Sequence, residues 1–345
     1  MVIDPDAQRV LDLIRAAGRP PFESITAQQA RELYLRSSAY LGAERADVLD
    51  VTDLDVPGPA GPVRIRLYRG IGAPASAPQP ALVYFHGGGW TIGDLETHDG
   101  LCRHLANAAR CMVIAAHYRL APEHKFPAAV EDCEAVVRWT CGEGGALGID
   151  RTRLAVGGDS AGGNLAAVMA HMARDGALPP LCFQLLIYPS VDQRLGQASY
   201  GRVTDGVPLT TATVRYFQEN YLSGAADKQD WRASPLLARR FDGLPPAIVI
   251  TAAHDPLCDE GHEYAAKLDQ AGCRVTHLHF NDQPHGFWHW GRLVRSADAA
   301  LEFAASRLRA AFDGPAVIEA LEKRSAINQE SNGELPAACL CARNG

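Results

Sequence analysis

Two glycine-rich segments contain the residues with the clearest chemical potential. Residues 86–90 read His-Gly-Gly-Gly-Trp, and residues 157–164 read Gly-Gly-Asp-Ser-Ala-Gly-Gly-Asn. The second segment contains the pattern Gly-x-Ser-x-Gly, which holds a nucleophilic serine, here Ser160, on a tight turn between a strand and a helix. A loop such as the first presents free backbone N–H groups that stabilise a developing oxyanion. Together, and in this order, the segments indicate acyl transfer by a serine hydrolase.

The residues that flank Ser160 match the setting that this motif requires. An apolar run at 154–156 precedes the motif, and a helix-forming run at 164–170 follows it. Gly158 and Gly162 permit a tight turn around a serine whose backbone lies in a disfavoured region. The alternative interpretation is a glycine-rich turn with an incidental serine. The succession of strand, turn and helix favours the nucleophile.

The loop at 86–90 follows an apolar run at 82–85, so it leaves the carboxyl end of a strand. We expect this end to lie at the same edge of the sheet as Ser160. The three glycines leave N–H groups unobstructed, and the N–H of Ala161 would be a further donor to an oxyanion. His86 precedes the nucleophile in the chain, and we expect it to order the loop by hydrogen bonding rather than to act as a base.

The base and its acidic partner should follow the serine, in the order serine, acid, histidine. His285 lies in a loop directly after the last predicted strand, and we choose it as the base, with His289 a distant second. Asp255 follows an apolar strand and precedes a proline, which places it on a loop at the active edge of the sheet. Asp192 competes from an equivalent position, whereas Asp159 adjoins the serine and is expected to point away. We prefer Asp255, whose role would be to fix the imidazole tautomer.

Other histidines after the serine are expected to have structural roles. His171 and His262 fall within predicted helices and are expected to be surface or packing residues. His277 and His279 fall within the last predicted strand, where we expect one to face the core and the other a helix. No metal is predicted, because no clear ligand set is formed by the C-terminal histidines His277, His279, His285 and His289.

Composition and charge restrict the classes of protein that this chain could represent. Its 345 residues suffice for one large α/β domain or two ordinary ones, and 47% of them are hydrophobic. The net charge of −7 and the lack of a basic stripe argue against a nucleic-acid partner. We see no apolar stretch of membrane-spanning length and no secretory signal. The nine cysteines, without Cys-x-x-Cys spacing, are typical of reduced thiols, so we expect a cytoplasmic protein.

The chain divides into a helical beginning and a longer region in which strands alternate with helices. Residues 1–45 predict amphipathic helices, one of them opened by a capping box of Thr26 and Gln29. Residues 46–314 predict a catalytic α/β domain with a mainly parallel sheet and helices on both faces. Within it, residues 190–235 are expected to form a cap with the N-terminal helices, and residues 315–345 a disordered tail. Strands are expected at 62–68, 81–86, 111–116, 153–157, 181–188, 246–252 and 274–280, and helices near 96–109, 126–140, 163–174, 259–271 and 293–312.

Several motifs, in this order, resemble those of the hormone-sensitive-lipase-like esterases, the bacterial family IV of the α/β-hydrolase superfamily. The resemblance covers roughly residues 50–312. The chain differs from the family at His117, because family members usually have an aspartate before the Tyr-Arg-Leu-Ala-Pro motif. The motifs are HGGGW at 86–90, YRLAPE at 118–123, GDSAGGN at 158–164, DPLCDEG at 255–261 and HGF at 285–287.

The resemblance implies the α/β-hydrolase fold with a helical cap over the site. It implies the same three catalytic residues that position in the chain favours, and it narrows the choice of oxyanion donors. Family members often form homodimers through the sheet edge, so a homodimer is possible here. The implied catalytic residues are Ser160, Asp255 and His285, and the implied donors are Gly88, Gly89 and Ala161, with Gly87 supporting the turn.

These observations predict a serine carboxylesterase that hydrolyses short-to-medium acyl esters through an acyl-enzyme, without a metal or cofactor. Its expected partner is a small ester. One alternative is an amidase or deacetylase of the same fold, and another is a ligand-binding relative that has lost the chemistry. We expect the cap to determine which ester the enzyme accepts. Contact with the substrate and ordinary packing are equally good interpretations of four residues, Trp90, Tyr216, Leu257 and Phe287.

Overall fold

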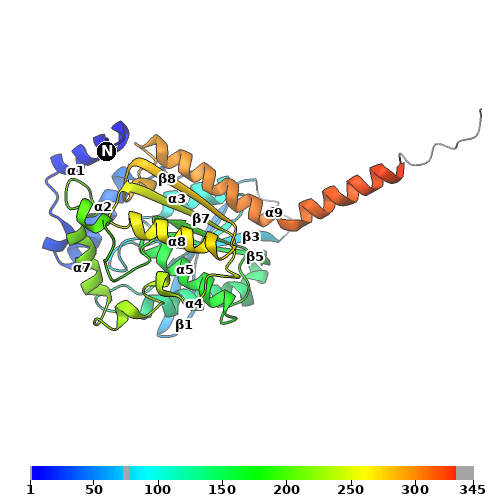
Figure 1. Ribbon diagram of the computed structural model, residues 1–345, viewed down its shortest axis with the longest axis horizontal. Coiled ribbons are helices and arrows are strands. Elements are labelled where there is room, and N and C mark those ends of the chain that lie inside the picture. Colours follow the sequence, from blue (N-terminus) through cyan, green and yellow to red (C-terminus); the bar gives the residue numbers. More distant parts are fainter. Residues whose placement is uncertain (1, 73–77, 332–345) are drawn as a thin grey trace, which may run out of the picture.

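The computed structural model describes residues 2–72 and 78–331. Within these residues, eight strands form one sheet in the order β1-β2-β4-β3-β5-β6-β7-β8, with helices on both faces (Figure 1). Strands β3 to β8 run parallel, whereas β2 is antiparallel to both β1 and β4. The predicted α/β architecture with a mainly parallel sheet is therefore confirmed. The strands are β1 Asp50–Gly58, β2 Gly61–Arg69, β3 Gln79–Phe85, β4 Met112–His117, β5 Ile149–Asp159, β6 Phe183–Ile187, β7 Ala247–His254 and β8 Val275–Pro284.

The edge strand β1 is missing from the set of predicted strands. Most of its residues are exposed or half-buried, so it lacks the apolar run that reveals the central strands. Its carboxylates pair with arginines of β2, Asp53 with Arg66 at 2.6 Å and Asp55 with Arg64 at 3.0 Å. Charged side chains on an edge strand disfavour pairing with another chain, which explains why this strand looks polar in the sequence.

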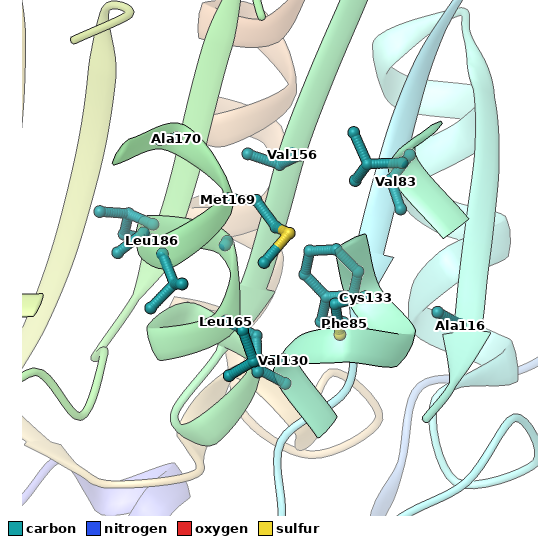
Figure 2. Close-up of a cluster of buried hydrophobic side chains, with 14 of the residues drawn as sticks. Val83, Phe85, Ala116, Val130, Cys133, Val156, Leu165, Met169, Ala170 and Leu186 are labelled. Carbon is teal, nitrogen blue, oxygen red and sulfur yellow. The ribbon is translucent and has the colours of Figure 1, made fainter. Parts of the chain in front are cut away.

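Two hydrophobic clusters pack helices against opposite faces of the sheet. Strands β3 and β6 are buried at every position, as expected of strands that are covered on both sides. Figure 2 shows part of the first cluster, in which Met169 of α5 lies near Val156 of β5 and Cys133 of α4. The first cluster includes α4 Ala128–Glu143, α5 Ala161–Arg174 and α8 Cys258–Gln270, and the second includes α1 Pro5–Ala16, α3 Asp99–Ala109 and α9 Arg295–Ser331.

A third, smaller hydrophobic cluster joins the N-terminal helices to the 190–235 segment. Helix α2 (Ala27–Leu41) contributes Ala30, and α7 (Thr211–Tyr221) contributes Val214 and Phe217. Figure 1 shows α1, α2 and α7 grouped at one side of the molecule. Both sides of the predicted capping box before α2 are present. This contact supports a cap built from the two segments, although the division into 1–45, 46–314 and 315–345 stays a prediction.

The C-terminal helix is longer than the predicted helix at 293–312. Helical backbone in α9 continues to Ser331, with a non-helical residue at Gly314 (φ 43°, ψ −160°). The first part of the predicted tail is therefore helical, and Figure 1 shows it leaving the body of the molecule. The rest of the predicted tail, 332–345, lies outside the described residues.

The described part of the chain bears on two expectations, namely that the cysteines are reduced and that no segment spans a membrane. Seven cysteines in this part are free, and five of them are buried, as is usual for small apolar side chains. No helix among the described residues is long and apolar enough to cross a membrane. The cytoplasmic location stays a prediction.

His171 of α5 is a buried packing residue and not a surface one. Its Nε2 lies 3.1 Å from the hydroxyl of Tyr264, and the rings of Trp231 and Phe241 pack against it edge-on. Burial, followed by the positive charge of Arg174, lowers the pKa of His171 to about 3. The folded protein therefore resists protonation here over a pH range in which the unfolded chain accepts it.

We expect acid to destabilise the protein partly through His171. A histidine whose pKa is lowered on folding contributes stability above its unfolded pKa of 6.5, and this stability declines as the pH falls toward 3. Between pH 7 and pH 5 this group should cost about 2 kcal/mol of unfolding free energy. In urea titrations, His171→Phe should lessen the acid-induced loss by about this amount. The exposed control His124→Phe should not, and equal losses in His171→Phe and the wild type would contradict the assignment.

Candidate active site

The turn between β5 and α5 holds Ser160 in a strained conformation. Its φ of 55° and ψ of −116° are costly for a residue with a Cβ atom. The turn is held by hydrogen bonds from Ser160 N to Ile187 O, at 2.8 Å, and from Asn164 N to Ser160 O, at 3.1 Å. A Cβ atom at Gly162 would lie 1.9 Å from the carbonyl oxygen of Phe85, so only glycine permits this approach of α5 to β3. The sharp turn leaves the serine lining a cavity.

His285 and Asp255 continue from Ser160 in a chain of two hydrogen bonds. The Oγ of Ser160 lies 3.0 Å from Nε2 of His285, and Nδ1 of His285 lies 2.7 Å from Oδ2 of Asp255. Asp255 directly follows β7 and is fully buried, and its Oδ1 accepts a hydrogen bond from the N–H of Leu257 at 2.8 Å. His285 directly follows β8, and the ring of Tyr188 packs against its imidazole at 4.4 Å. The structure thus brings together the three residues chosen from the sequence.

The alternative acid and base have other partners. The Asp192 carboxylate accepts a hydrogen bond from Arg194 at 2.7 Å. The Nε2 of His289 lies 2.8 Å from Oδ2 of Asp159. Among the hydrogen bonds of the described residues, none joins Asp192 to His285 or His289 to Ser160. The geometry therefore favours the first choice for both roles.

The loop after β3 offers backbone N–H groups that are not hydrogen-bonded to any atom of the described residues. Gly88 and Gly89 have φ values of 115° and 56°, left-handed conformations that glycine adopts readily. Within the described residues, the N–H groups of Gly88, Gly89 and Ala161 have no hydrogen-bond acceptor, whereas the N–H of Gly87 donates to Asp159 at 3.0 Å. The three free donors belong to residues that line the same cavity as Ser160. Such donors suit an anionic oxygen.

His86 orders this loop. Its Nδ1 lies 2.8 Å from the carbonyl oxygen of Gly87, and its ring stacks on Tyr118 at 4.3 Å. The Tyr118 hydroxyl also donates to the carbonyl oxygen of His86 at 2.7 Å. Burial holds the pKa of His86 well below its usual range, so the imidazole is neutral. These contacts agree with the expectation that His86 supports the loop and is not a base.

A buried carboxylate beside the serine is a feature that the sequence analysis undervalues. Asp159 accepts hydrogen bonds from the hydroxyl of Tyr84 at 2.8 Å and from the N–H of Gly87 at 3.0 Å, and it also contacts His98 and His289. Burial raises the pKa of Asp159, but His289 and His98 outweigh burial and hold it well below its usual value. The carboxylate of Asp159 anchors the glycine loop, and Asp159 lines the same cavity as Ser160. The sequence offered one indication of this role, because a charged residue at the end of a buried strand needs polar partners.

A cavity of about 340 Å³ lies over the serine. Ser160 and His285 line it, together with Trp90 and Leu257, two of the four residues considered for substrate contact. The cavity lies between the sheet edge and the helices of the proposed cap, so the cap shapes the space beside the nucleophile. Residues from these helices and from the segment before α7 include Tyr34, Leu209, Val214 and Phe217.

The other two residues considered for substrate contact lie outside the cavity lining that the described residues form. Phe287 is fully buried in the hydrophobic cluster between the sheet and α9. The Tyr216 hydroxyl donates to the carbonyl oxygen of Ile25 at 3.3 Å, which ties α7 to the N-terminal segment. Because successive helical residues point about 100° apart, Phe217 reaches the cavity in place of Tyr216. These positions favour the packing interpretation for both residues.

The sheet, the serine turn and the cavity above it define an α/β-hydrolase. A family model described as alpha/beta hydrolase fold matches residues 82–289, more than half of the chain. The chain therefore belongs to the α/β-hydrolase family. Its resemblance to the hormone-sensitive-lipase-like esterases is confirmed by this match and by the relatives below.

Named relatives agree with the predicted enzyme class, carboxylic ester hydrolase. The chain is 44% identical over 271 residues to carboxylic ester hydrolase LipN of Mycobacterium tuberculosis, covering 76% of this chain and 70% of the relative. It is 37% identical to an ethyl acetate hydrolase of Pseudomonas putida, covering 90% and 99% of the two chains. A solved α/β hydrolase from the metagenome of Lake Arreo is 41% identical, with a TM-score of 0.87 and coverage of 90% and 99%.

We expect Asp159→Asn to lower kcat about 10-fold on a chromogenic acetate ester. The substitution keeps the shape but removes the charge that strengthens the hydrogen bond from Gly87, a difference of about 1.4 kcal/mol between charged and neutral acceptors. Steady-state kinetics measure the effect, and circular dichroism checks the fold. The control Asp192→Asn removes another buried aspartate and should stay within about twofold of the wild type. A wild-type kcat in Asp159→Asn would contradict the anchoring role.

Proposed function

We propose that this protein is a serine carboxylesterase whose nucleophile is Ser160. The observation that carries the proposal is the chain of hydrogen bonds from the serine through His285 to the buried Asp255, at 3.0 Å and 2.7 Å. A serine next to a histidine that is itself oriented by a carboxylate is the arrangement that activates a hydroxyl for acyl transfer. The esterase names of the relatives support ester hydrolysis as the reaction.

The reaction begins when the Oγ of Ser160 attacks the ester carbonyl and Nε2 of His285 takes the hydroxyl proton. The negative charge that develops on the carbonyl oxygen is stabilised by the free N–H groups of residues 88, 89 and 161. Asp255 keeps Nδ1 of His285 protonated and stabilises the imidazolium. Because Asp255 is fully buried, this interaction is little screened by solvent.

Collapse of the tetrahedral intermediate breaks the bond between the carbonyl carbon and the alcohol oxygen. His285 donates its proton to the leaving alcohol, and the acyl group stays on Ser160 as an ester. Water then attacks this acyl-enzyme, again giving its proton to His285, and the acid product leaves as the serine hydroxyl is restored. The proton transfers and the stabilisation of charge in these steps are provided by side chains and backbone groups of this chain.

The cavity supports a substrate with a short-to-medium acyl chain. Its volume of about 340 Å³ is near the lower end of small-molecule pockets. Apolar side chains such as Val214, Phe217 and Leu257 line it and would contact an alkyl chain. One relative is named for the hydrolysis of ethyl acetate, an ester with a small acyl group.

We expect Ser160→Ala to abolish hydrolysis of chromogenic acetate and butyrate esters, because it removes the only atom that forms the acyl-enzyme. Initial rates should fall at least about 10³-fold, with unchanged thermal unfolding. The wild type should hydrolyse an ester faster than its matching anilide. Faster anilide hydrolysis would favour an amidase, and substantial turnover by Ser160→Ala would overturn the assignment of the nucleophile.

A series of esters with increasing acyl length should show a maximum in kcat/KM at short-to-medium chains. Each buried methylene contributes up to about 0.8 kcal/mol, or about fourfold, until the chain meets the wall of the cavity. Phe217→Ala removes part of that wall and should shift the maximum to longer chains. The matched control Tyr216→Ala alters the adjacent residue, which does not line the cavity, and should leave the maximum in place. An unchanged maximum in Phe217→Ala would contradict this view of the pocket.

A further inference from the structure

Four side chains with nitrogen or sulfur donor atoms meet between α8 and β8, outside the proposed active site. Cys258 and His262 lie four residues apart on α8, and His277 and His279 lie two residues apart on β8. Residues four apart share a face of a helix, and residues two apart share a face of a strand. The expectation that His277 and His279 face opposite sides is therefore wrong. The two pairs face one another where α8 covers the edge of the sheet.

The three imidazoles converge on the hydroxyl of Thr251 in the neighbouring strand β7. Its Oγ1 lies 2.9 Å from Nε2 of His277, 2.9 Å from Nδ1 of His279 and 3.4 Å from Nε2 of His262. His262 and His279 place these same nitrogens 3.1 Å apart. Cys258, His262 and His279 each contribute one donor atom to a set within 4.8 Å of one another. The hydroxyl can donate to one of these ring nitrogens and accept from the other two, whereas a cation would bind a lone pair of each nitrogen.

We propose that Cys258, His262 and His279 form a zinc-binding site, and that His277, which lies outside this set of three, moves in as the fourth ligand when the ion binds. Thiolate and imidazole are the usual ligands of Zn²⁺, whereas Ca²⁺ and Mg²⁺ prefer oxygen. In a tetrahedral zinc site, bonds of about 2.0–2.3 Å place ligand atoms about 3.3–3.7 Å apart, so the nitrogens of His262 and His279, which lie 3.1 Å apart, need to separate by only a few tenths of an ångström. Binding draws the thiol of Cys258 inward and releases its proton. The resulting thiolate balances one of the two positive charges of the ion.

The position of this site connects it to both partners of the proposed nucleophile. Cys258 is the first residue of α8, and its N–H donates to the carbonyl oxygen of Asp255 at 3.1 Å. Strand β8 ends at Pro284, immediately before His285. An ion held by α8 and β8 therefore ties together the two elements that carry the acid and the base. The proposal of zinc binding stands independently of the proposed function. Only the effect of zinc on the active site rests on that function.

The test is zinc binding by the full chain after removal of metal with a chelator. Competition with a chromogenic chelator should show one Zn²⁺ bound per chain with submicromolar Kd, and zinc should raise the Tm. Cobalt in place of zinc should give the visible bands of a tetrahedral site and a thiolate charge-transfer band. Cys258→Ser should remove the charge-transfer band. Each of Cys258→Ser, His262→Gln, His277→Gln and His279→Gln should weaken binding at least about 10-fold.

Controls separate this site from other thiols and histidines. Cys182→Ser and His124→Gln remove residues outside the cluster and should keep wild-type affinity. His98, Asp159 and His289 form a second group with metal-ligand spacing, so His289→Gln is included. The Tm of each metal-free variant checks its fold. Weak binding by the wild type, binding lost only in His289→Gln, or unchanged binding in all four ligand variants would each overturn the proposal.

Discussion

The close approach of α5 to the end of β3 is the constraint on which the proposed active site depends. Gly162 lies against the carbonyl oxygen of Phe85, where a Cβ atom would be 1.9 Å away. Phe85 is the last residue of β3, and the glycine loop starts at the next residue. The same contact therefore sets the serine turn and the loop of free N–H donors beside each other. Strain at Ser160 persists because the surrounding packing leaves the turn no alternative.

Two consecutive residues of this turn, Asp159 and Ser160, have different roles in the proposed site. Both residues line the cavity, and Asp159 also accepts the N–H of Gly87. This hydrogen bond occupies the first glycine donor of the loop and leaves those of Gly88 and Gly89 without protein acceptors, within the described residues. The negative charge of Asp159 also holds His289, which lines the cavity but points its Nε2 toward the carboxylate. The turn thus supplies the proposed nucleophile and orders the groups around it.

Local patterns in the sequence predicted the parts of the fold and site that depend on local rules. The strand–turn–helix around Ser160 and the carboxyl ends of parallel strands were enough to choose Asp255 and His285. Features that depend on packing between distant segments were not predictable in this way. The choice of Phe217 over Tyr216 depends on how α7 is rotated on the cap, and the strand β1 is hidden by its surface carboxylates. The position of His277 and His279 on one face of β8 follows from strand periodicity, so the expectation that they face opposite sides misapplied that rule.

The acid and the base are carried by the last two strands of the described sheet, and this arrangement needs support. Strand β8 pairs only with β7 among the described strands, and most of its residues are half-buried or exposed. A bond of 2.7 Å between Asp255 and His285 nevertheless requires the two loops to keep their spacing. Burial of Asp255 makes its imidazole partner energetically important, because an unpaired carboxylate in the interior is costly. A zinc ion between α8 and β8 would add a cross-link between the two elements that adjoin the loops of the acid and the base.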